Sequence, residues 1–285
     1  MDTSYTITPY ERRYRQPTLD LIFHSVRVHT HLDWHETGQW LDLQEATVWL
    51  AWADSRLAGV MAVSTPMSGT CWLRLVALRD DVPAASVLGA LWEALNPTLQ
   101  QWGVHVVALL IVNDWLVNHV PALGFRYDED IVTLRRDGTE LPPLRPVAVT
   151  VRSAGHEDLQ RMTEVDQTAF AAPWQLTLGD LRQARRIAAT CTVALHEGEI
   201  VGYQLSTLYR QSGHLARLAV MPTLQGVGVG STLLDDLIRR FLRRGVRTIT
   251  VNTQASNHRS QRLYARYQFE RNGYDLPVWT AEITA

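Results

Sequence analysis

The sequence predicts an α/β fold, of the α+β type, built from two copies of one domain in tandem. Three observations predict it: an internal repeat, a proline-rich segment between the copies, and a strand, a glycine-rich loop and a helix in succession. Aligned with itself at an offset of about 143 residues, the chain places residues 57–60 over 200–203 and residues 74–77 (Arg-Leu-Val-Ala) over 217–220 (Arg-Leu-Ala-Val). Ordered matches at a nearly constant offset indicate a duplicated domain.

The segment between the two copies is polar and rich in proline. Residues 137–146 read Asp-Gly-Thr-Glu-Leu-Pro-Pro-Leu-Arg-Pro, a composition typical of a linker. We therefore expect one domain over residues 1–136 and a second over residues 147–285.

The second copy can be assigned element by element. Two strand-like runs flank Glu197-Gly198, which predicts a hairpin. Thr177 and Asn257 are suitable N-caps, and Gly245 is a suitable residue just after a helix. The expected strands cover residues 147–152, 190–195, 200–208, 214–221 and 248–253. Two expected helices cover residues 157–169 and 177–186. A third runs from Ser231 to Gly245, and the last begins at Asn257.

The most informative stretch is the glycine-rich loop between the strand at 214–221 and the helix that begins at Ser231. It contains Gly226, Gly228 and Gly230, whose missing Cβ atoms let the backbone approach a ligand closely. The first N–H groups of a helix have no intrahelical partners, and the helix dipole adds positive potential there. The loop therefore predicts an anion site, with a pyrophosphate as the ligand.

The spacing of the glycines excludes two common pyrophosphate loops. A P-loop requires Lys after its last glycine, and no Lys follows Gly230. A dinucleotide-binding loop has the spacing G-x-G-x-x-G directly after its strand, whereas this chain has G-x-G-x-G after the intervening residues 221–225. The pattern from Gln225 to Gly230 instead resembles Q-x-x-G-x-G, the coenzyme A loop of the GNAT N-acetyltransferases.

Two further segments of the second copy carry the same resemblance. Residues 257–264 (Asn-His-Arg-Ser-Gln-Arg-Leu-Tyr) are similar to the family's helix with an asparagine and a Leu-Tyr pair. Residues 170–174 (Phe-Ala-Ala-Pro-Trp) resemble a segment of the ribosomal-protein alanine acetyltransferases within that superfamily. The resemblance implies a mixed, mostly antiparallel sheet flanked by helices in each domain, acetyl-CoA as co-substrate and no metal.

The resemblance also implies where the coenzyme binds. The pantetheine arm is expected to pair with backbone groups of the strand, and the pyrophosphate to rest on N–H groups of the loop, which carries no Lys or Arg. Asn257, Ser260 and Tyr264 share one helix face, where the family's tyrosine protonates the departing thiolate. The expected coenzyme-binding residues are Leu218, Ala219, Val220, Gln225, Gly226, Val227, Gly228, Val229, Gly230, Ser231, Asn257 and Ser260.

The general base is not determined by these motifs. The alanine acetyltransferases carry a catalytic Glu at the position of Asn252, and an amide cannot accept a proton at neutral pH. Histone acetyltransferases use a Glu at the position of His214, and histidine titrates near neutrality. Three alternatives are open: His214 is the base, His214 is only an exposed residue at the start of its strand, or a water relay runs through Asn252. The candidate catalytic residues are therefore Tyr264, His214 and Asn252.

The first copy lacks the glycine-rich loop. The corresponding residues, 82–87, read Val-Pro-Ala-Ala-Ser-Val, so Pro83 removes an N–H donor and side chains replace the glycines. We expect the first domain to have lost the coenzyme site, to pack against the second and to shape the acceptor cleft.

Composition and short motifs argue against several other classes of protein. The formal net charge of −2 argues against a nucleic-acid surface, and two cysteines argue against a disulfide framework. The longest apolar run, residues 106–112, is too short to span a bilayer, and the N-terminus lacks the layout of a signal peptide. Among the histidines from His24 to His35, His31 and His35 could share one helix face, but no Glu follows His31 as the zinc motif H-E-x-x-H requires, and no third ligand is evident. We expect a cytoplasmic monomer or homodimer.

The sequence therefore predicts an acetyl-CoA-dependent N-acetyltransferase in which a primary amine attacks the thioester directly. The expected acceptor is a protein or peptide α-amine, or else the amine of a small metabolite or antibiotic. A non-catalytic sensor that binds acyl-CoA is the alternative outside the enzymes.

Overall fold

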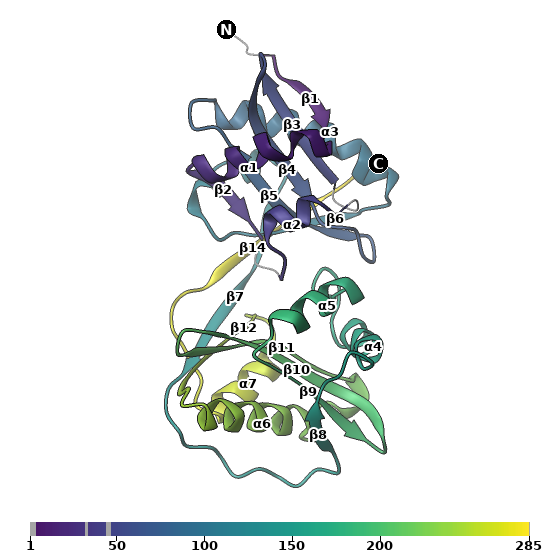
Figure 1. The fold of residues 1–285 in the computed structure, drawn as a ribbon, viewed down its shortest axis with the longest axis vertical. Coiled ribbons are helices and arrows are strands. Elements are labelled where there is room, and N and C mark those ends of the chain that lie inside the picture. The colour runs from purple at the N-terminus through teal and green to yellow at the C-terminus, as the bar shows by residue number, and fades with distance from the viewer. Residues whose placement is uncertain (1–3, 32–33, 44–46, 285) are drawn as a thin grey trace. The chain divides into compact units, whose positions relative to one another are not determined.

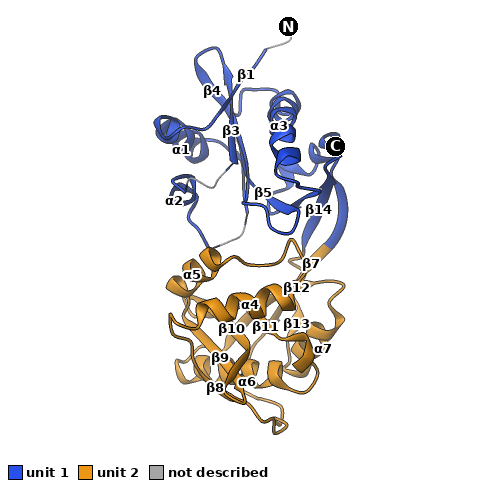
Figure 2. Ribbon diagram, turned by 90° about the vertical axis from the view of Figure 1, so that its right-hand side faces the viewer, with its two compact units in different colours: residues 1–129, 276–285 blue, residues 130–275 orange. Residues whose placement is uncertain are grey.

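The computed structural model describes residues 4–31, 34–43 and 47–284. The chain forms two compact units (Figure 2). Unit 1 comprises residues 1–129 and 276–285, and unit 2 comprises residues 130–275. Each unit is described by itself below.

Unit 2 holds most of the second copy. Its strands are β7 (Arg126–Arg136, from residue 130 on), β8 (Thr150–Ser153), β9 (Thr190–His196), β10 (Glu199–Tyr209), β11 (Ser212–Val220), β12 (Thr248–Gln254) and β13 (Glu270–Arg271). Its α-helices are α4 (Leu159–Ala169), α5 (Leu178–Ile187), α6 (Val229–Arg243) and α7 (His258–Arg266). The sheet runs in the order β7-β12-β11-β10-β9-β8, with β13 paired to β7. Helices α4 and α5 lie on one face, and α6 and α7 on the other (Figure 1).

Local sequence signals position these elements as predicted. The side chain of Thr177 accepts from the N–H of Asp180, and the Asp180 carboxylate accepts from the N–H of Thr177, which closes a capping box on α5. Asn257 caps α7 by accepting from the N–H of Ser260 at 3.1 Å. Gly245 follows α6 with a φ of +78°, which favours glycine.

Several boundaries differ from the prediction by one to three residues, and two of these differences lie near the glycine-rich loop. Helix α6 begins at Val229 rather than Ser231, because Gly228, with a φ of +114°, already serves as its N-cap. Strand β8 begins at Thr150 rather than at residue 147, because Val147 packs against the loop instead of continuing the strand. A Cβ added to Gly228 would lie 2.6 Å from Cγ2 of Val147.

Unit 1 has the same plan. Its strands are β1 (Thr6–Pro9), β2 (Arg27–Thr30), β3 (Thr47–Ala53), β4 (Arg56–Val63), β5 (Thr70–Leu78), β6 (Val106–Leu110) and β14 (Leu276–Glu282). Its α-helices are α1 (Arg15–His24), α2 (Thr37–Leu41) and α3 (Ala84–Gln101). The order is β1-β3-β4-β5-β6-β14, with β2 paired to β5. Apolar residues of α1 and α2 bury one face of this sheet, and those of α3 bury the other.

The repeat found in the sequence corresponds to equivalent positions in the two units. It aligned Arg74 of β5 with Arg217 of β11. The guanidinium carbon of Arg74 lies 4.1 Å from the ring centroid of Trp40 in unit 1, and that of Arg217 lies 3.6 Å from the ring centroid of Phe170 in unit 2. Each unit therefore holds its matched arginine against an aromatic ring.

The two units differ from the expected division at residues 137–146, because their last strands are exchanged. Strand β7 follows the first copy in sequence, yet its residues 131–136 pair with β12 of unit 2. Strand β14 follows the second copy, yet it pairs with β6 of unit 1. Self-comparison of the sequence aligns the copies without showing which sheet a terminal strand joins. Neither half of the chain contains all the strands of one unit.

The predicted mixed, mostly antiparallel α/β fold is confirmed. Within the described residues, only β5–β6 and β11–β12 pair in parallel among the named strands of each unit. The described helices include none with the length and apolar character needed to cross a membrane.

Candidate functional site

Strands β11 and β12 pair over only part of their length. The parallel ladder joins residues 212–215 to residues 248–251 and then ends. Just beyond it, Ala216 is an extra residue between the β10 pairing of Leu215 and that of Arg217, which makes a β-bulge. A bulge bends its strand and disrupts pairing locally, so the rest of β11 leaves β12. Unit 2 therefore has two facing strand edges whose backbone groups do not pair with each other.

The backbone of β11 presents alternate residues to this edge. The N–H of Met221, just after β11, donates to the carbonyl of Val201 in β10 at 2.8 Å. In an antiparallel pair both polar groups of a residue face the same side, and successive residues alternate. Ala219 therefore faces β10, whereas Leu218 and Val220 face the side of β12. Of the three predicted residues, the backbone groups of Leu218 and Val220 thus face the side of β12, and those of Ala219 face β10.

The glycine-rich loop leads from β11 into α6. Gly226 and Gly228 have φ values of +85° and +114°, a region that L-residues rarely adopt. The first intrahelical bond of α6 runs from the N–H of Thr232 to the carbonyl of Gly228 at 3.0 Å. The N–H groups of residues 229–231 thus have no acceptor within the helix. Together they form a cluster of donors at the positive end of the helix dipole.

Arg259 supplies a cation beside the loop. Its guanidinium donates to Oε1 of Gln225, and Nε2 of Gln225 donates to the carbonyl of Val220 at 3.0 Å. Gln225 is a neutral partner, and no carboxylate among the described residues pairs with Arg259. The loop itself has no Lys or Arg, but the first turn of α7 brings one to it.

Tyr264 lies in the apolar cluster that α6 and α7 form on the sheet, and only 4% of its surface is exposed. Its ring packs against Phe269 with centroids 5.7 Å apart. Its hydroxyl has no hydrogen-bond partner among the described residues. Burial raises the pKa of the Tyr264 hydroxyl, and the positive charge of Arg217 opposes that shift. The phenol is therefore protonated at neutral pH.

His214 lies away from the unpaired edge. It belongs to the paired part of β11, opposite Thr250, and its Nδ1 is 2.9 Å from the hydroxyl of Thr250. Leu218 is four positions further along the chain, about 13 Å on an extended strand. Burial lowers the pKa of the His214 imidazole, which is therefore neutral at pH 7. The structure thus buries His214 in part and does not bring it to the backbone groups of Leu218 and Val220 that face the side of β12.

Asn252 is the first residue of β12 beyond the parallel ladder. Its Oδ1 is shielded from solvent and has no hydrogen-bond partner among the described residues. A buried acceptor left unpaired costs about 1–3 kcal/mol, so this atom favours a ligand or a water that brings an N–H or O–H donor. Asn252 therefore begins the part of β12 that does not pair with β11.

The remaining predicted residues have identifiable structural roles. The side-chain oxygen of Asn257 caps α7 by accepting a hydrogen bond from the N–H of Ser260. Val227 is exposed at the tip of the loop, and Val229 is buried at the start of α6. The structure therefore gathers the loop, α7 and the free edge of β11 in one region, and leaves His214 apart.

Two side chains important to this region escaped the sequence patterns. Arg259 lies within a segment already singled out, but only the fold shows that it reaches Gln225, 34 positions earlier. Arg217 appeared only as part of the repeat, and its partner Asp166 is 51 positions away. The one available signal for Arg217 was its place at the centre of a predicted strand, because a charged side chain that is buried there needs an oppositely charged partner.

Comparison with known proteins agrees with the predicted resemblance. Residues 159–269 match the family described as acetyltransferase (GNAT). The bS18-alanine N-acetyltransferase of Haemophilus influenzae is 27% identical over 118 residues, which cover 41% of this chain and 75% of that protein. The mycothiol acetyltransferase of Acidimicrobium ferrooxidans is 29% identical over 225 residues, 70% of each protein. A solved tandem GNAT protein from the clavulanic acid biosynthesis pathway, 15% identical, has a TM-score of 0.63 over 99% of both chains.

Proposed function

The C-terminal half of this chain belongs to the GNAT acetyltransferase family and makes it an acyltransferase, and we propose that it transfers acetyl from acetyl-CoA to an amine of low pKa. The observation that carries the proposal is the edge of β11 that pairs with no strand of the described residues, directly before a glycine-rich helix start that has no side-chain cap. The first suits an extended amide chain, and the second suits a pyrophosphate. Acetyl-CoA carries both groups.

The coenzyme is proposed to bind along β11 and the loop. Leu218 and Val220 offer backbone groups to the amides of the pantetheine arm, and the N–H groups of residues 226–231 hold the pyrophosphate. Arg259 adds a positive charge that the loop lacks. Tyr264 offers a protonated hydroxyl to the thiolate that leaves when the amine attacks the thioester carbonyl.

Arg259→Gln is expected to weaken coenzyme A binding about 10-fold, because a charge-assisted hydrogen bond contributes roughly 1.5–3 kcal/mol. The loss should shrink as salt is raised, since exposed charges are screened. Isothermal titration calorimetry with coenzyme A at two salt concentrations measures both effects.

The matched control is Arg243→Gln, which removes the same charge from the last turn of α6, about 20 Å from its start. This variant should bind coenzyme A as the wild type does. Equal affinities for all three proteins would remove Arg259 from the coenzyme site.

The lack of a strong general base in the proposed site favours an acceptor amine of low pKa. An amine must be neutral to attack, Asn252 cannot take its proton, and His214 is bonded to Thr250 away from the unpaired edge. An α-amine, with a reference pKa of about 7.7–8.0, is roughly one-tenth or more neutral at pH 7, whereas a lysine amine near 10.4 is neutral only about once in several thousand molecules. We therefore favour a protein or peptide α-amine, the type of group that the name of the Haemophilus influenzae relative indicates.

A peptide with a free N-terminus is expected to react faster than its N-blocked, lysine-containing counterpart. The rate should rise with pH through the acceptor's own pKa, and the raised pKa of Tyr264 keeps the proton donor present on the alkaline side. His214→Ala should change the rate with the α-amine by less than about threefold, since a positioned general base would contribute about 10²–10⁴. Thiol release from acetyl-CoA, recorded against pH, measures each rate. A preference for the lysine peptide together with a large loss in His214→Ala would overturn this acceptor assignment.

A small-molecule amine is the second candidate acceptor. The observation that favours it is the mycothiol acetyltransferase, because its alignment extends over 70% of both chains and so includes part of the first copy. The same thiol-release assay with a panel of small amines compares the two candidates. The better acceptor is the one with the larger kcat/KM.

Unit 1 is proposed to have no coenzyme site. Its helix α3 begins after Pro83, which has no N–H to donate, and side chains stand at the positions that are glycines in the second copy. One coenzyme A per chain is therefore the expected stoichiometry.

A further inference from the structure

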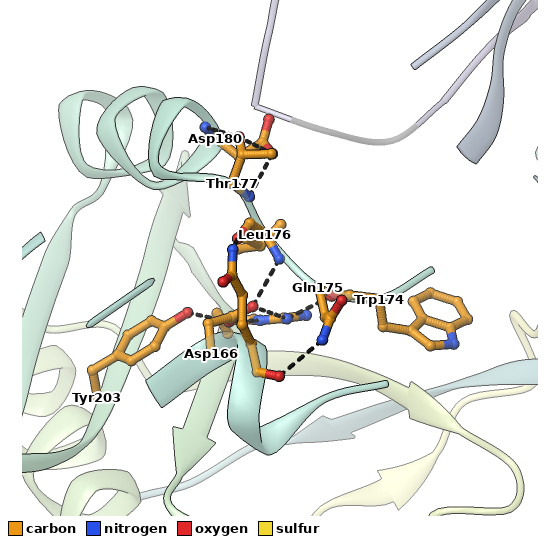
Figure 3. Close-up of polar contacts among 9 residues, drawn as sticks. Asp166, Trp174, Gln175, Leu176, Thr177, Asp180 and Tyr203 are labelled. Atoms are coloured by element: carbon orange, nitrogen blue, oxygen red, sulfur yellow. Dashed lines mark hydrogen bonds and ion pairs between the residues drawn. The ribbon is translucent and has the colours of Figure 1, made fainter. Parts of the chain in front are cut away.

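A buried carboxylate forms the centre of a polar network in unit 2 (Figure 3). Asp166 of α4 is fully buried and accepts from Nε and Nη2 of Arg217, each at 2.7 Å, and from the hydroxyl of Tyr203. It also accepts from the backbone N–H of Leu176 at 2.8 Å. Four donors on its two oxygens fill the hydrogen-bonding capacity of the Asp166 carboxylate.

This network holds the segment of residues 170–176, between α4 and α5. Nη2 of Arg217 also donates to the carbonyl of Trp174 at 2.6 Å, and the guanidinium stacks on the ring of Phe170. Asp166 holds Leu176 from the other side. A single buried ion pair therefore fixes the beginning, middle and end of the segment, which has no regular secondary structure of its own.

The same arginine is adjacent to the proposed site of acyl transfer. Arg217 lies on β11 immediately before Leu218, whose backbone faces the unpaired edge. Arg217 therefore joins residues 170–176 to the part of β11 that is proposed to receive the thioester.

We propose that Arg217 is a positioning residue for the acceptor: through Asp166 and the carbonyl of Trp174 it fixes residues 170–176 as one wall of the acceptor site. This inference rests on the proposed acetyl transfer. It assigns Arg217 no contact with the reacting atoms. An alternative in which the ion pair only stabilises the fold predicts lower stability with unchanged acceptor recognition.

Arg217→Lys tests the proposal, because lysine keeps the charge beside Asp166 but cannot make the bidentate pair and the bond to Trp174 together. The matched control is Tyr203→Phe, which removes a hydrogen bond from the same carboxylate and leaves the arginine and the segment connected. In Arg217→Lys the KM for the peptide amine should rise about 10–100-fold, since a displacement of about 1 Å costs that much. Coenzyme A affinity should stay within about twofold of wild type in both variants, and Tyr203→Phe should keep its KM.

Hydrogen–deuterium exchange gives a readout that does not depend on turnover. Amides of residues 174–176 should exchange at least about tenfold faster in Arg217→Lys than in the wild type, and at the wild-type rate in Tyr203→Phe. Absence of turnover with every amine would refute the proposed function, while the exchange data would still decide whether Arg217 holds the segment. Unchanged exchange, or an unchanged KM in an active Arg217→Lys protein, would overturn the inference.

Discussion

Gly228→Glu is expected to abolish coenzyme A binding, with a loss of at least about 100-fold. Gly228 is the N-cap of α6 and has a φ of +114°, so any side chain there strains the loop. Its Cβ would lie 2.6 Å from Val147, and the new carboxylate would face the N–H groups that are proposed to hold the pyrophosphate. Losing two charge-assisted hydrogen bonds, at roughly 1.5–3 kcal/mol each, corresponds to a factor of about 100 or more.

Gly228→Gln separates the two causes of that loss. Glutamine introduces the same bulk and backbone strain without the charge, so the difference between the two variants reports repulsion of the pyrophosphate. We expect Gly228→Glu to bind at least about tenfold more weakly than Gly228→Gln, since two like charges near 4 Å repel by about 1–4 kcal/mol. Calorimetry should give one site per chain for the wild type. Two equivalent sites, or binding that survives Gly228→Glu in a folded protein, would contradict the assignment of the site to unit 2.

The elements of unit 2 were predictable because their signals are local. Thr177 and Asp180 are close in sequence, so their capping box is visible in the sequence itself. Asn257 before α7 and Gly245 after α6 are similarly local signals. The period of apolar residues then gives each element its type. This is why the predicted first residues of α6 and β8 differ from the observed ones by only two or three positions.

The contacts that complete the candidate site are not local, and the sequence did not predict them. Asp166 meets Tyr203 and Arg217 across 37 and 51 positions, and pairing at that distance depends on the order of the strands. The exchange of β7 and β14 is of the same kind, since each strand pairs with a strand of the copy that it does not belong to in sequence. The bulge at Ala216 likewise appears only in the pairing with β10, and it changes which residues of β11 face the side of β12.

Tyr264→Phe is expected to lower kcat by roughly 10²–10⁴ while leaving coenzyme A affinity within about twofold. Phenylalanine keeps the ring that packs against Phe269, and the lost hydroxyl has no hydrogen-bond partner among the described residues, so the fold should be unaffected. Burial raises the pKa of Tyr264, so its hydroxyl stays protonated while the thiol of coenzyme A, with a reference pKa of about 8.5, leaves as a thiolate. The thiolate carries more charge in the transition state than in bound acetyl-CoA. A donor aimed at it therefore accelerates the reaction without strengthening coenzyme binding.

Tyr267→Phe is the matched control for this variant. Tyr267 directly follows α7 and is also buried, but its hydroxyl donates to the carbonyl of Ser231 at 2.9 Å. Its removal should lower the free energy of unfolding by about 0.5–1.5 kcal/mol and leave kcat unchanged. Single-turnover measurements at saturating acetyl-CoA isolate the chemical step from product release. If Tyr264→Phe and Tyr267→Phe behave alike there, both losing stability and neither losing rate, then Tyr264 is a core residue and the thiolate takes its proton from water.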